Sequence, residues 1–296
     1  MNFTFLGTSA GIPTQERNVT ALIVQPPSGR DWYLVDCGEG TQHQLLQTPF
    51  SLVKLKAIFI THVHGDHCFG LPGLIASAHM QGRREPLTIC APAGIETMIR
   101  QIIELCDMSR LRFELNFIAS DEPGFQYQDE RVCVNAFELS HRVPCFAYRF
   151  EERLQEADPR SPRRLMVGGD NDRPELLIPA MRAGDVLIHE ATFSQAVLEA
   201  IGPVTQHSSA LQVAKAAEAA GISELVLTHF SQRYSRRVAK GPHSMNSLRV
   251  EAKKAFNGKL HLARDFEYYR IEADKSLSCS SIHELASKPK AAGRKA

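Results

Sequence analysis

The sequence predicts a mixed α/β layered sandwich in which strands outnumber helices. Short apolar blocks, expected to be strands, recur at residues 3–7, 21–25, 32–38, 57–62, 87–91, 132–141, 145–151, 165–170, 185–191, 224–230 and 260–272. Several blocks are continuously apolar, which is typical of strands covered on both faces. The first three lie too close together for crossover helices, so they form a meander, which excludes a doubly wound parallel sheet.

Three amphipathic segments between the later strands predict helices. The segment 94–106 has apolar residues at helical spacing and follows Pro92. The segment 208–221 opens with serines, which are favourable helix caps, and ends on Gly221, a favourable helix stop. The segment 245–258 has the same form. We expect these helices to cover the sheets.

Composition narrows the class of protein. The 296 residues, 43% hydrophobic and 23% charged, are typical of a soluble globular protein with a sizeable core. The net charge of +1 favours no particular partner, so nucleic-acid binding would need a local basic patch. Seven scattered cysteines without a CxxC pair argue against a disulfide framework and suit a reducing cytoplasm. We expect no signal peptide and no membrane span.

The chain divides into one large domain and a short tail. Residues 1–273 hold all the expected strands and helices. Residues 274–296 are rich in Ser, Lys and Ala, and we expect a mostly disordered basic tail there. The charged segment 151–164 contains two prolines and is expected to form an exposed loop.

The stretch "IFITHVHGDHCFGL" contains the highest density of potential metal ligands. His62, His64, Asp66 and His67 follow an apolar run directly. Imidazole and carboxylate together suit zinc or a similar divalent ion. His62 and His64 are two residues apart and project from one side of an extended segment, while Gly65 permits a sharp turn. This pattern predicts a metal site at the end of a buried strand.

Four groups in one cluster cannot all bind one tetrahedral ion and leave a position open, so two ions are the economical interpretation. The further ligands are expected at the ends of other strands. His141, Asp170 and His229 each end an apolar run, as His62 does. Two bound cations would share a hydroxide and neutralise a phosphodiester, which points to hydrolysis by metal-activated hydroxide.

The chain resembles the ribonuclease Z branch of the metallo-β-lactamase superfamily. The motifs that carry the resemblance run in family order from residue 5 to residue 234. They are "FLGTSAGIPTQERN", "LVDCGEGTQHQL", "THVHGDHCFGLPGL", "HRVPCFAYRF", "GGDNDRP", "HEATF", "HSSALQVA" and "LTHFSQRY". The resemblance implies a metallo-β-lactamase fold, a four-layer αβ/βα sandwich, with two Zn²⁺ ions per chain; Mn²⁺ or another divalent ion is the alternative.

The resemblance also implies roles for single residues. One zinc would be held by His62, His64 and His141, and the other by Asp66, His67 and His229, with Asp170 as the bridge. Asp66 would also accept the proton of the attacking water. Glu190 and His207 correspond to a pair near the leaving group, from which we infer that His207 protonates the departing oxygen and Glu190 orients it. A buried Glu–His hydrogen bond that only fixes a loop is the other interpretation.

Two departures from the family pattern leave questions open. The motif "GGDNDRP" has one extra residue, so Asp172 competes with Asp170 for the bridging position. In many ribonuclease Z enzymes a long arm that clamps the tRNA elbow lies between these histidine and aspartate positions. Here His141 and Asp170 are only 29 residues apart, without the Gly/Pro-rich arm. Arg160, Arg163 and Arg164 are candidates for a shorter grip, with Arg233, Arg236, Arg237 and the tail as helpers, and Ser231 is a further substrate-binding candidate.

The leading hypothesis is a metal-dependent endoribonuclease for the 3′ processing of precursor tRNA, active as a homodimer by family analogy. A phosphodiesterase for small cyclic nucleotides or other phosphodiesters is the second hypothesis, favoured by the missing arm. A non-catalytic nucleic-acid-binding relative is the third, and the intact ligand set argues against it. The sequence predicts no membrane partner.

Overall fold

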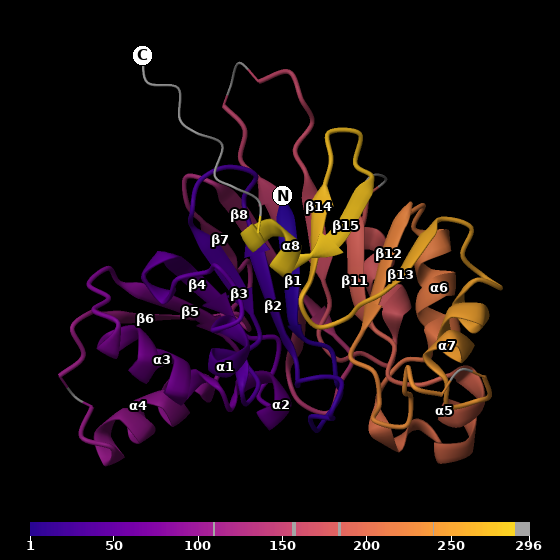
Figure 1. The fold of residues 1–296 in the computed structure, drawn as a ribbon, viewed down its shortest axis with the longest axis horizontal. Helices are drawn as coiled ribbons and strands as arrows, with labels where there is room; N and C mark the ends of the chain where they lie inside the picture. Colours follow the sequence, from indigo (N-terminus) through magenta and orange to yellow (C-terminus); the bar gives the residue numbers. More distant parts are fainter. Residues whose placement is uncertain (109, 156–157, 183–184, 239, 288–296) are drawn as a thin grey trace.

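A computed structural model describes residues 1–108, 110–155, 158–182, 185–238 and 240–287, and in it two β-sheets face each other with helices on their outer sides (Figure 1). The first sheet holds β1 (Asn2–Gly7), β2 (Ala21–Gln25), β3 (Trp32–Val35), β4 (Leu55–Phe59), β5 (Leu87–Ala91), β6 (Leu115–Ala119), β14 (Glu267–Ile271) and β15 (Leu277–Ser281). Its order is β15-β14-β1-β2-β3-β4-β5-β6. The predicted layered sandwich is therefore confirmed.

The second sheet has its own order of strands. It holds β7 (Gln126–Gln128), β8 (Val132–Leu139), β9 (Cys145–Glu152), β10 (Arg164–Val167), β11 (Val186–Glu190), β12 (Glu224–Thr228) and β13 (Lys259–Leu262). The order is β13-β12-β11-β10-β9-β8-β7. In each sheet an antiparallel part is joined to a parallel part, β3 to β6 in the first and β10 to β13 in the second. The first three strands form the meander expected from their spacing.

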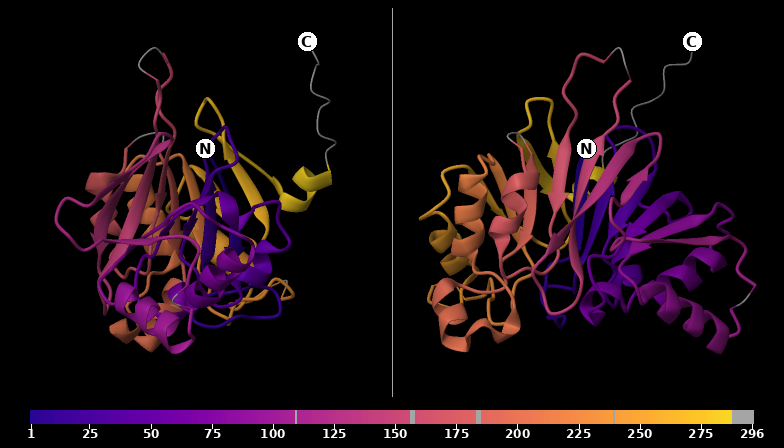
Figure 2. Two further views of the ribbon diagram at one scale, coloured as in Figure 1. Left: turned by 90° about the vertical axis from the view of Figure 1, so that its left-hand side faces the viewer. Right: turned by 180° about the vertical axis from the view of Figure 1, so that it is seen from behind.

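Helices cover both outer faces, as Figure 2 shows from the side and from behind. The helices of the first half are α1 (Thr41–Leu45), α2 (Gly65–Cys68), α3 (Leu71–Met80) and α4 (Ile95–Leu105), with the 3₁₀ turn η1 (Leu52–Lys54). Those of the second half are α5 (Gln195–Ile201), α6 (Ala210–Ala219) and α7 (Met245–Ala252), with η2 (Pro174–Ala180) and η3 (Pro203–Thr205). The Ser209 hydroxyl caps α6 by accepting a hydrogen bond from the backbone of Gln212. No helix in the described part of the chain is long and apolar enough to cross a membrane.

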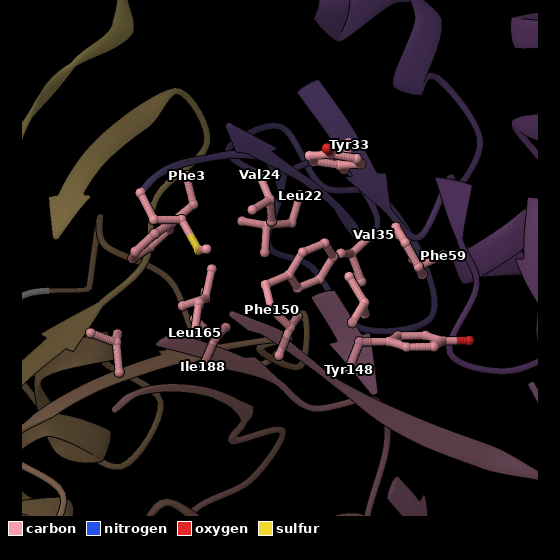
Figure 3. Packing of buried hydrophobic residues seen from close by; sticks show 14 of the residues in the cluster. Phe3, Leu22, Val24, Tyr33, Val35, Phe59, Tyr148, Phe150, Leu165 and Ile188 are labelled. Atoms are coloured by element: carbon pink, nitrogen blue, oxygen red, sulfur yellow. The ribbon is translucent and has the colours of Figure 1, made fainter. Parts of the chain in front are cut away.

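The core lies between the two sheets, where alternate side chains of each strand point inward. Figure 3 shows Phe3, Leu22, Val24, Tyr33, Val35 and Phe59 of the first sheet facing Tyr148, Phe150, Leu165 and Ile188 of the second. The rings of Phe59 and Phe150 pack edge to face, with centroids 5.1 Å apart. Met166, between two inward residues of β10, points instead to the layer that packs beneath α6. The strands are thus buried on both faces, which explains their continuous apolar runs.

Two expectations about the end of the chain are wrong. The apolar run 260–272 is not one strand, because the chain turns between β13 and β14 and crosses from the second sheet to the first. The tail expected to be disordered from residue 274 contains β15, which pairs antiparallel with β14, and α8 (Ile282–Ser287). Backbone pairing with β14 and the buried side chain of Ile282 hold this segment. Residues 288–296, the rest of the expected tail, lie outside the described residues.

The parallel strands bring their carboxyl ends to one edge of the sandwich. The residues after β3, β4, β10, β11 and β12 all lie at this edge, since parallel strands point the same way. Here the two sheets also touch, because the Phe146 amide donates a hydrogen bond to the Thr61 carbonyl at 3.0 Å. The polar residues that end the apolar runs therefore meet where the sheets come together.

Candidate metal centre

Three histidines and one carboxylate converge at this edge. His62 Nε2 lies 3.0 Å from His64 Nδ1, which lies 3.2 Å from His141 Nε2. Asp170 Oδ2 lies 3.6 Å from His62 Nε2 and 3.9 Å from His141 Nε2. A tetrahedral zinc ion with bonds of about 2.0–2.1 Å would separate its ligand atoms by about 3.3 Å. The four atoms thus have the spacing of one tetrahedral ligand set.

A second group lies on the other side of Asp170. His67 Nε2 and His229 Nε2 are 3.2 Å apart, and Asp66 Oδ2 is 3.5 Å from the first and 3.4 Å from the second. Asp170 Oδ1 lies 3.5 Å from His67 Nε2 and 3.4 Å from His229 Nε2. The ligand atoms of Asp66, His67 and His229 thus have the spacing of three ligands around one cation, and Asp170 Oδ1 lies beside the two histidines. Each oxygen of Asp170 therefore faces a different group of ligands.

The donor chemistry of the cluster fits divalent cations. Four of its histidines have Nδ1 next to an acceptor, so that the Nε2 lone pair turns inward. The acceptors are Asp36 Oδ2 for His67 at 2.8 Å, the Gln206 carbonyl for His141 at 3.0 Å, the Thr192 hydroxyl for His229 at 3.0 Å and the Thr61 hydroxyl for His62 at 3.1 Å. Inward lone pairs at such short separations repel one another unless a cation lies between them. In addition, Asp170 Oδ1 is buried without a hydrogen-bond partner.

The pKa values of the buried groups also indicate a site for positive charge. Burial opposes a charge on His67, but the carboxylates of Asp36, Asp170 and Asp66 raise the pKa of His67 to about 10. Burial would raise the pKa of Asp170, yet the surrounding histidines, first of all His229, hold it well below the usual range. The site is therefore a buried concentration of carboxylate charge that favours positive charge strongly.

Asp36 is a functional residue that the sequence reasoning did not single out. Its carboxylate accepts hydrogen bonds from the Thr61 amide at 2.8 Å, from the Thr61 hydroxyl and from His67 Nδ1. Asp36 has a φ of 59°, which is strained for a residue with a side chain. The signal was present, because Asp36 ends the apolar run 32–35 just as His62 ends its own run.

Thr192 is a second missed residue, and it connects the metal centre to Glu190. Its hydroxyl lies 2.7 Å from Glu190 Oε2 and 3.0 Å from His229 Nδ1. Donation to Glu190 leaves the oxygen free to accept the His229 Nδ1–H. His229 itself has a φ of 55°, so both a ligand and Asp36 sit on strained backbone.

The structure brings His207 and Glu190 together beside Asp170. His207 Nδ1 lies 3.5 Å from Glu190 Oε1 and 3.7 Å from Asp170 Oδ2. Burial disfavours the charged imidazole, but Asp170 and Glu190 raise the pKa of His207 to about 9. Glu190 is anchored by the backbone amides of Ser208 at 2.6 Å and Thr192 at 2.8 Å. His207 is therefore held as a protonated group at the mouth of the cluster.

Asp170, rather than Asp172, faces both groups of ligands. Candidate metal ligands in the described residues include Asp170 in two separate clusters, and Asp172 in none. The preceding Gly169 allows this approach, because a Cβ at that position would lie 2.7 Å from Cys145 Sγ and from Thr61 Cβ. No larger residue could bring the chain so close to the first sheet.

Arg163 and Arg164, the candidates for a shorter grip on the substrate, lie at the end of the strands opposite the metal centre. Arg164 begins β10 and pairs with Asp185, while Arg163 pairs with Glu152 at 3.0 Å. From Arg164 to Asp170 the chain runs along β10, so the arginine lies about 20 Å away, at the other end of the strand. The described residues 158–163 that precede Arg164 lie at the end of the sandwich opposite α2 (Figure 1). Arg163 and Arg164 therefore lie away from the metal centre of their own chain.

Ser231 and Arg233 follow His229 closely. Ser231 is buried, its carbonyl accepts a hydrogen bond from Arg17 at 3.2 Å, and its hydroxyl accepts one from the Arg233 amide. The Arg233 side chain is exposed, four residues after His229. Of the two candidates that follow β12, Arg233 is thus the one with a solvent-facing charge.

Comparison with known proteins agrees with this geometry. A model of the beta-lactamase superfamily domain matches residues 31–230. Ribonuclease Z of Marinobacter nauticus is 48% identical over 319 residues, covering 94% of this chain and 98% of the relative. Ribonuclease Z of Pseudomonas putida is 44% identical, covering 95% and 100%. The crystal structure of human tRNase Z, short form, superimposes with a TM-score of 0.72 at 30% identity, covering 92% and 100%.

The fold and the site thus define a metallo-β-lactamase-type hydrolase domain, as the resemblance implied. Within that class, the chain belongs to the ribonuclease Z family.

The position of Asp36 generates a prediction about metal affinity. Asp36→Asn leaves one acceptor oxygen where two served the Thr61 amide and His67 Nδ1–H, so the tautomer of His67 is no longer fixed, and we expect divalent-metal affinity to fall about 10–100-fold. Competition with a chromophoric chelator measures this affinity, and Asp121→Asn, which alters an exposed carboxylate, is the matched control. Equal affinities for the two variants would contradict the positioning role of Asp36.

Proposed function

We propose that the chain is a divalent-metal-dependent endoribonuclease that processes the 3′ end of precursor tRNA. The proposal rests on one observation above all, the two neighbouring groups of candidate metal ligands between which Asp170 lies. Membership of the ribonuclease Z family supports RNA as the substrate, and the tRNase Z title of the human structure supports tRNA.

Two Zn²⁺ ions are the proposed occupants, with Mn²⁺ as the alternative. His62, His64 and His141 would hold the first, while Asp66, His67 and His229 would hold the second, with Asp170 between them. The concentration of negative charge supports divalent cations, because the carboxylates of Asp36, Asp66, Asp170 and Glu190 outnumber the positive charge of His207 at this site.

Bound divalent ions would supply an acidified water molecule and neutralise the charge of the phosphodiester. Asp66 is proposed to accept the proton of the attacking water. The Gly11 amide donates a hydrogen bond to Asp66 Oδ2 at 2.7 Å, which fixes the carboxylate. Despite burial, His67 and His229 hold the pKa of Asp66 well below its usual range, so the carboxylate is ionised.

His207 is proposed to complete the reaction on the leaving-group side. As water oxygen bonds to phosphorus, the bond from phosphorus to the ribose oxygen breaks, and His207 gives its proton to that oxygen. Glu190 keeps His207 protonated and oriented, since it is 3.5 Å away and is itself anchored by two backbone amides. Asp66 and His207 would then act as base and acid of one displacement.

One observation favours the second hypothesis, a phosphodiesterase for small cyclic nucleotides or other phosphodiesters. The alignment with the Marinobacter nauticus protein has 319 positions, yet 94% of this chain is about 278 residues, so about 41 positions have no residue of this chain opposite them. A shorter chain offers less surface for a large RNA.

A homodimer in a reducing cytoplasm is proposed by family analogy. All seven cysteines are free thiols, which supports a reducing compartment. Light scattering tests the assembly, and a mass equal to that of one chain would argue against the dimer.

Substrate choice is tested by offering precursor tRNA and cyclic nucleotides side by side to the zinc- or manganese-loaded protein. We expect cleavage of precursor tRNA at the 3′ side, and Asp66→Ala should abolish it because the variant lacks both a ligand and the proton acceptor. Gel analysis of the RNA products measures cleavage. Hydrolysis of cyclic nucleotides alone would refute the endoribonuclease and support the second hypothesis.

The bridging carboxylate is tested by metal content. Asp170→Asn should retain at most one ion per chain, because an amide bridges two cations poorly, whereas Asp172→Asn should retain the wild-type number. Mass spectrometry of the dialysed proteins counts the ions and identifies the metal. The same ion content in both variants would show that Asp170 is not the bridge.

The role of His207 is tested with two leaving groups. We expect His207→Ala to slow precursor tRNA cleavage about 10²–10⁴-fold. Hydrolysis of a nitrophenyl phosphodiester should be slowed far less, since nitrophenolate leaves without a proton. His43→Ala, which alters an exposed histidine of α1, is the control. An equal slowing of both substrates would assign His207 to structure rather than to proton donation.

A further inference from the structure

A basic pocket lies beside α7, at the end of the edge strand β13. Three arginines line it, Arg236, Arg249 and Arg264, together with apolar side chains that include Met245 and Leu262. Its volume is about 230 Å³. No carboxylate is among the described residues that line it. The pocket therefore offers space and positive charge on one surface.

The arginines are held in place but only partly neutralised. Arg236 Nη2 donates to the carbonyls of Leu262 at 3.3 Å and Ala263 at 2.9 Å, and Arg249 Nη1 donates to the carbonyl of Leu260 at 3.2 Å. Carbonyls orient a guanidinium without cancelling its charge. Burial, and next the nearby charge of Arg264, lower the pKa of Arg236 to about 10.

Two carboxylates lie near the pocket, and one of them pairs with a pocket arginine. Glu267 pairs with the exposed Arg264 at 3.6 Å, and Glu16 pairs with Arg237 at 3.2 Å. Glu16 also accepts a hydrogen bond from the backbone amide of Arg236. In the described part of the chain no carboxylate forms an ion pair with the side chain of Arg236 or Arg249. The net charge around the pocket is positive, and an anion would relieve the repulsion.

The pocket and the metal centre lie at the same edge of the second sheet. β12 and β13 are parallel neighbours, with Leu227 opposite Leu262. His229 follows Leu227 by two residues, and Arg264 follows Leu262 by two. Neighbouring strands lie about 4.8 Å apart, so a chain leaving the metal centre along this edge passes the pocket within a short distance.

We infer that Arg236, Arg249 and Arg264 form a phosphate-binding pocket that grips the backbone of the RNA substrate outside the metal centre. A guanidinium suits this ligand because its planar donors match two oxygens of one phosphate. The inference rests on the proposed endoribonuclease function. The pocket would give the protein an RNA-binding surface within its folded domain, although about 41 positions of the alignment with its relative have no residue of this chain.

The test uses Arg249→Ala, Arg264→Ala and the double variant in the metal-loaded full chain. Arg84→Ala is the matched control, since it removes an exposed positive charge near the start of β5, at the opposite edge of its sheet. KM and kcat are measured on precursor tRNA over a range of salt concentrations, and hydrolysis of bis(p-nitrophenyl) phosphate reports the metal centre alone.

We expect KM for precursor tRNA to rise about ten- to a hundredfold in the double variant, because charge-assisted hydrogen bonds are lost. The slope of log affinity against log salt should become shallower by about 0.7–0.9 for each phosphate contact removed. Hydrolysis of the small ester and all properties of Arg84→Ala should match the wild type.

Two outcomes would contradict the inference that the pocket binds RNA phosphates. Unchanged KM and salt dependence in the double variant would do so, and so would an equal loss on the small ester, which would mark the arginines as structural. A wild-type protein that hydrolyses the ester but cuts no RNA refutes the proposed function instead. In that case the affinity for labelled precursor tRNA is measured by fluorescence anisotropy. Equal affinities of the wild type and the double variant would contradict phosphate binding in the pocket.

Discussion

A single carboxylate, that of Asp170, connects the two halves of the molecule. Its two oxygens face separate groups of candidate ligands. The first group is His62, His64 and His141, and the second is Asp66, His67 and His229. Those ligands come from both sheets, so the arrangement requires the sheets to meet at their carboxyl edge. Gly169 makes the approach possible, because any side chain there would collide with Cys145 and Thr61.

The ligands are held by a surrounding layer of hydrogen bonds that costs conformational energy. Asp36 and His229 both occupy the left-handed region, which is unfavourable by about 1–3 kcal/mol each. The buried core between the sheets and the pairing of β12 with β13 hold these backbones in place. In return, His67 and His229 present the correct nitrogen to the cluster, and Thr192 links the metal side of the site to Glu190 and His207.

The candidate metal centre and the arginine pocket lie at the same edge of the second sheet. The metal centre opens toward His64, His141 and His207, while the arginine pocket lies one strand farther along the second sheet. The arginines between β9 and β10 lie at the other end of the strands, and they are paired with Glu152 and Asp185. Positive charge near the candidate metal centre comes from Arg142, next to His141, and from the segments that follow β12 and β13.

The sequence alone determined most of the strand pattern, the candidate ligands and the family, because a polar residue that ends an apolar run is a local signal. Asp36 carried that signal as well, but its contact with His67 depends on the pairing of β3 with β4. The sequence did not separate Asp170 from Asp172, since one residue of register changes which carboxylate faces the histidines. Nor did it foresee β15 or the arginine pocket. Arg236, Arg249 and Arg264 lie on three separate segments, and only the parallel pairing of β13 with β12 brings them together beside the metal centre.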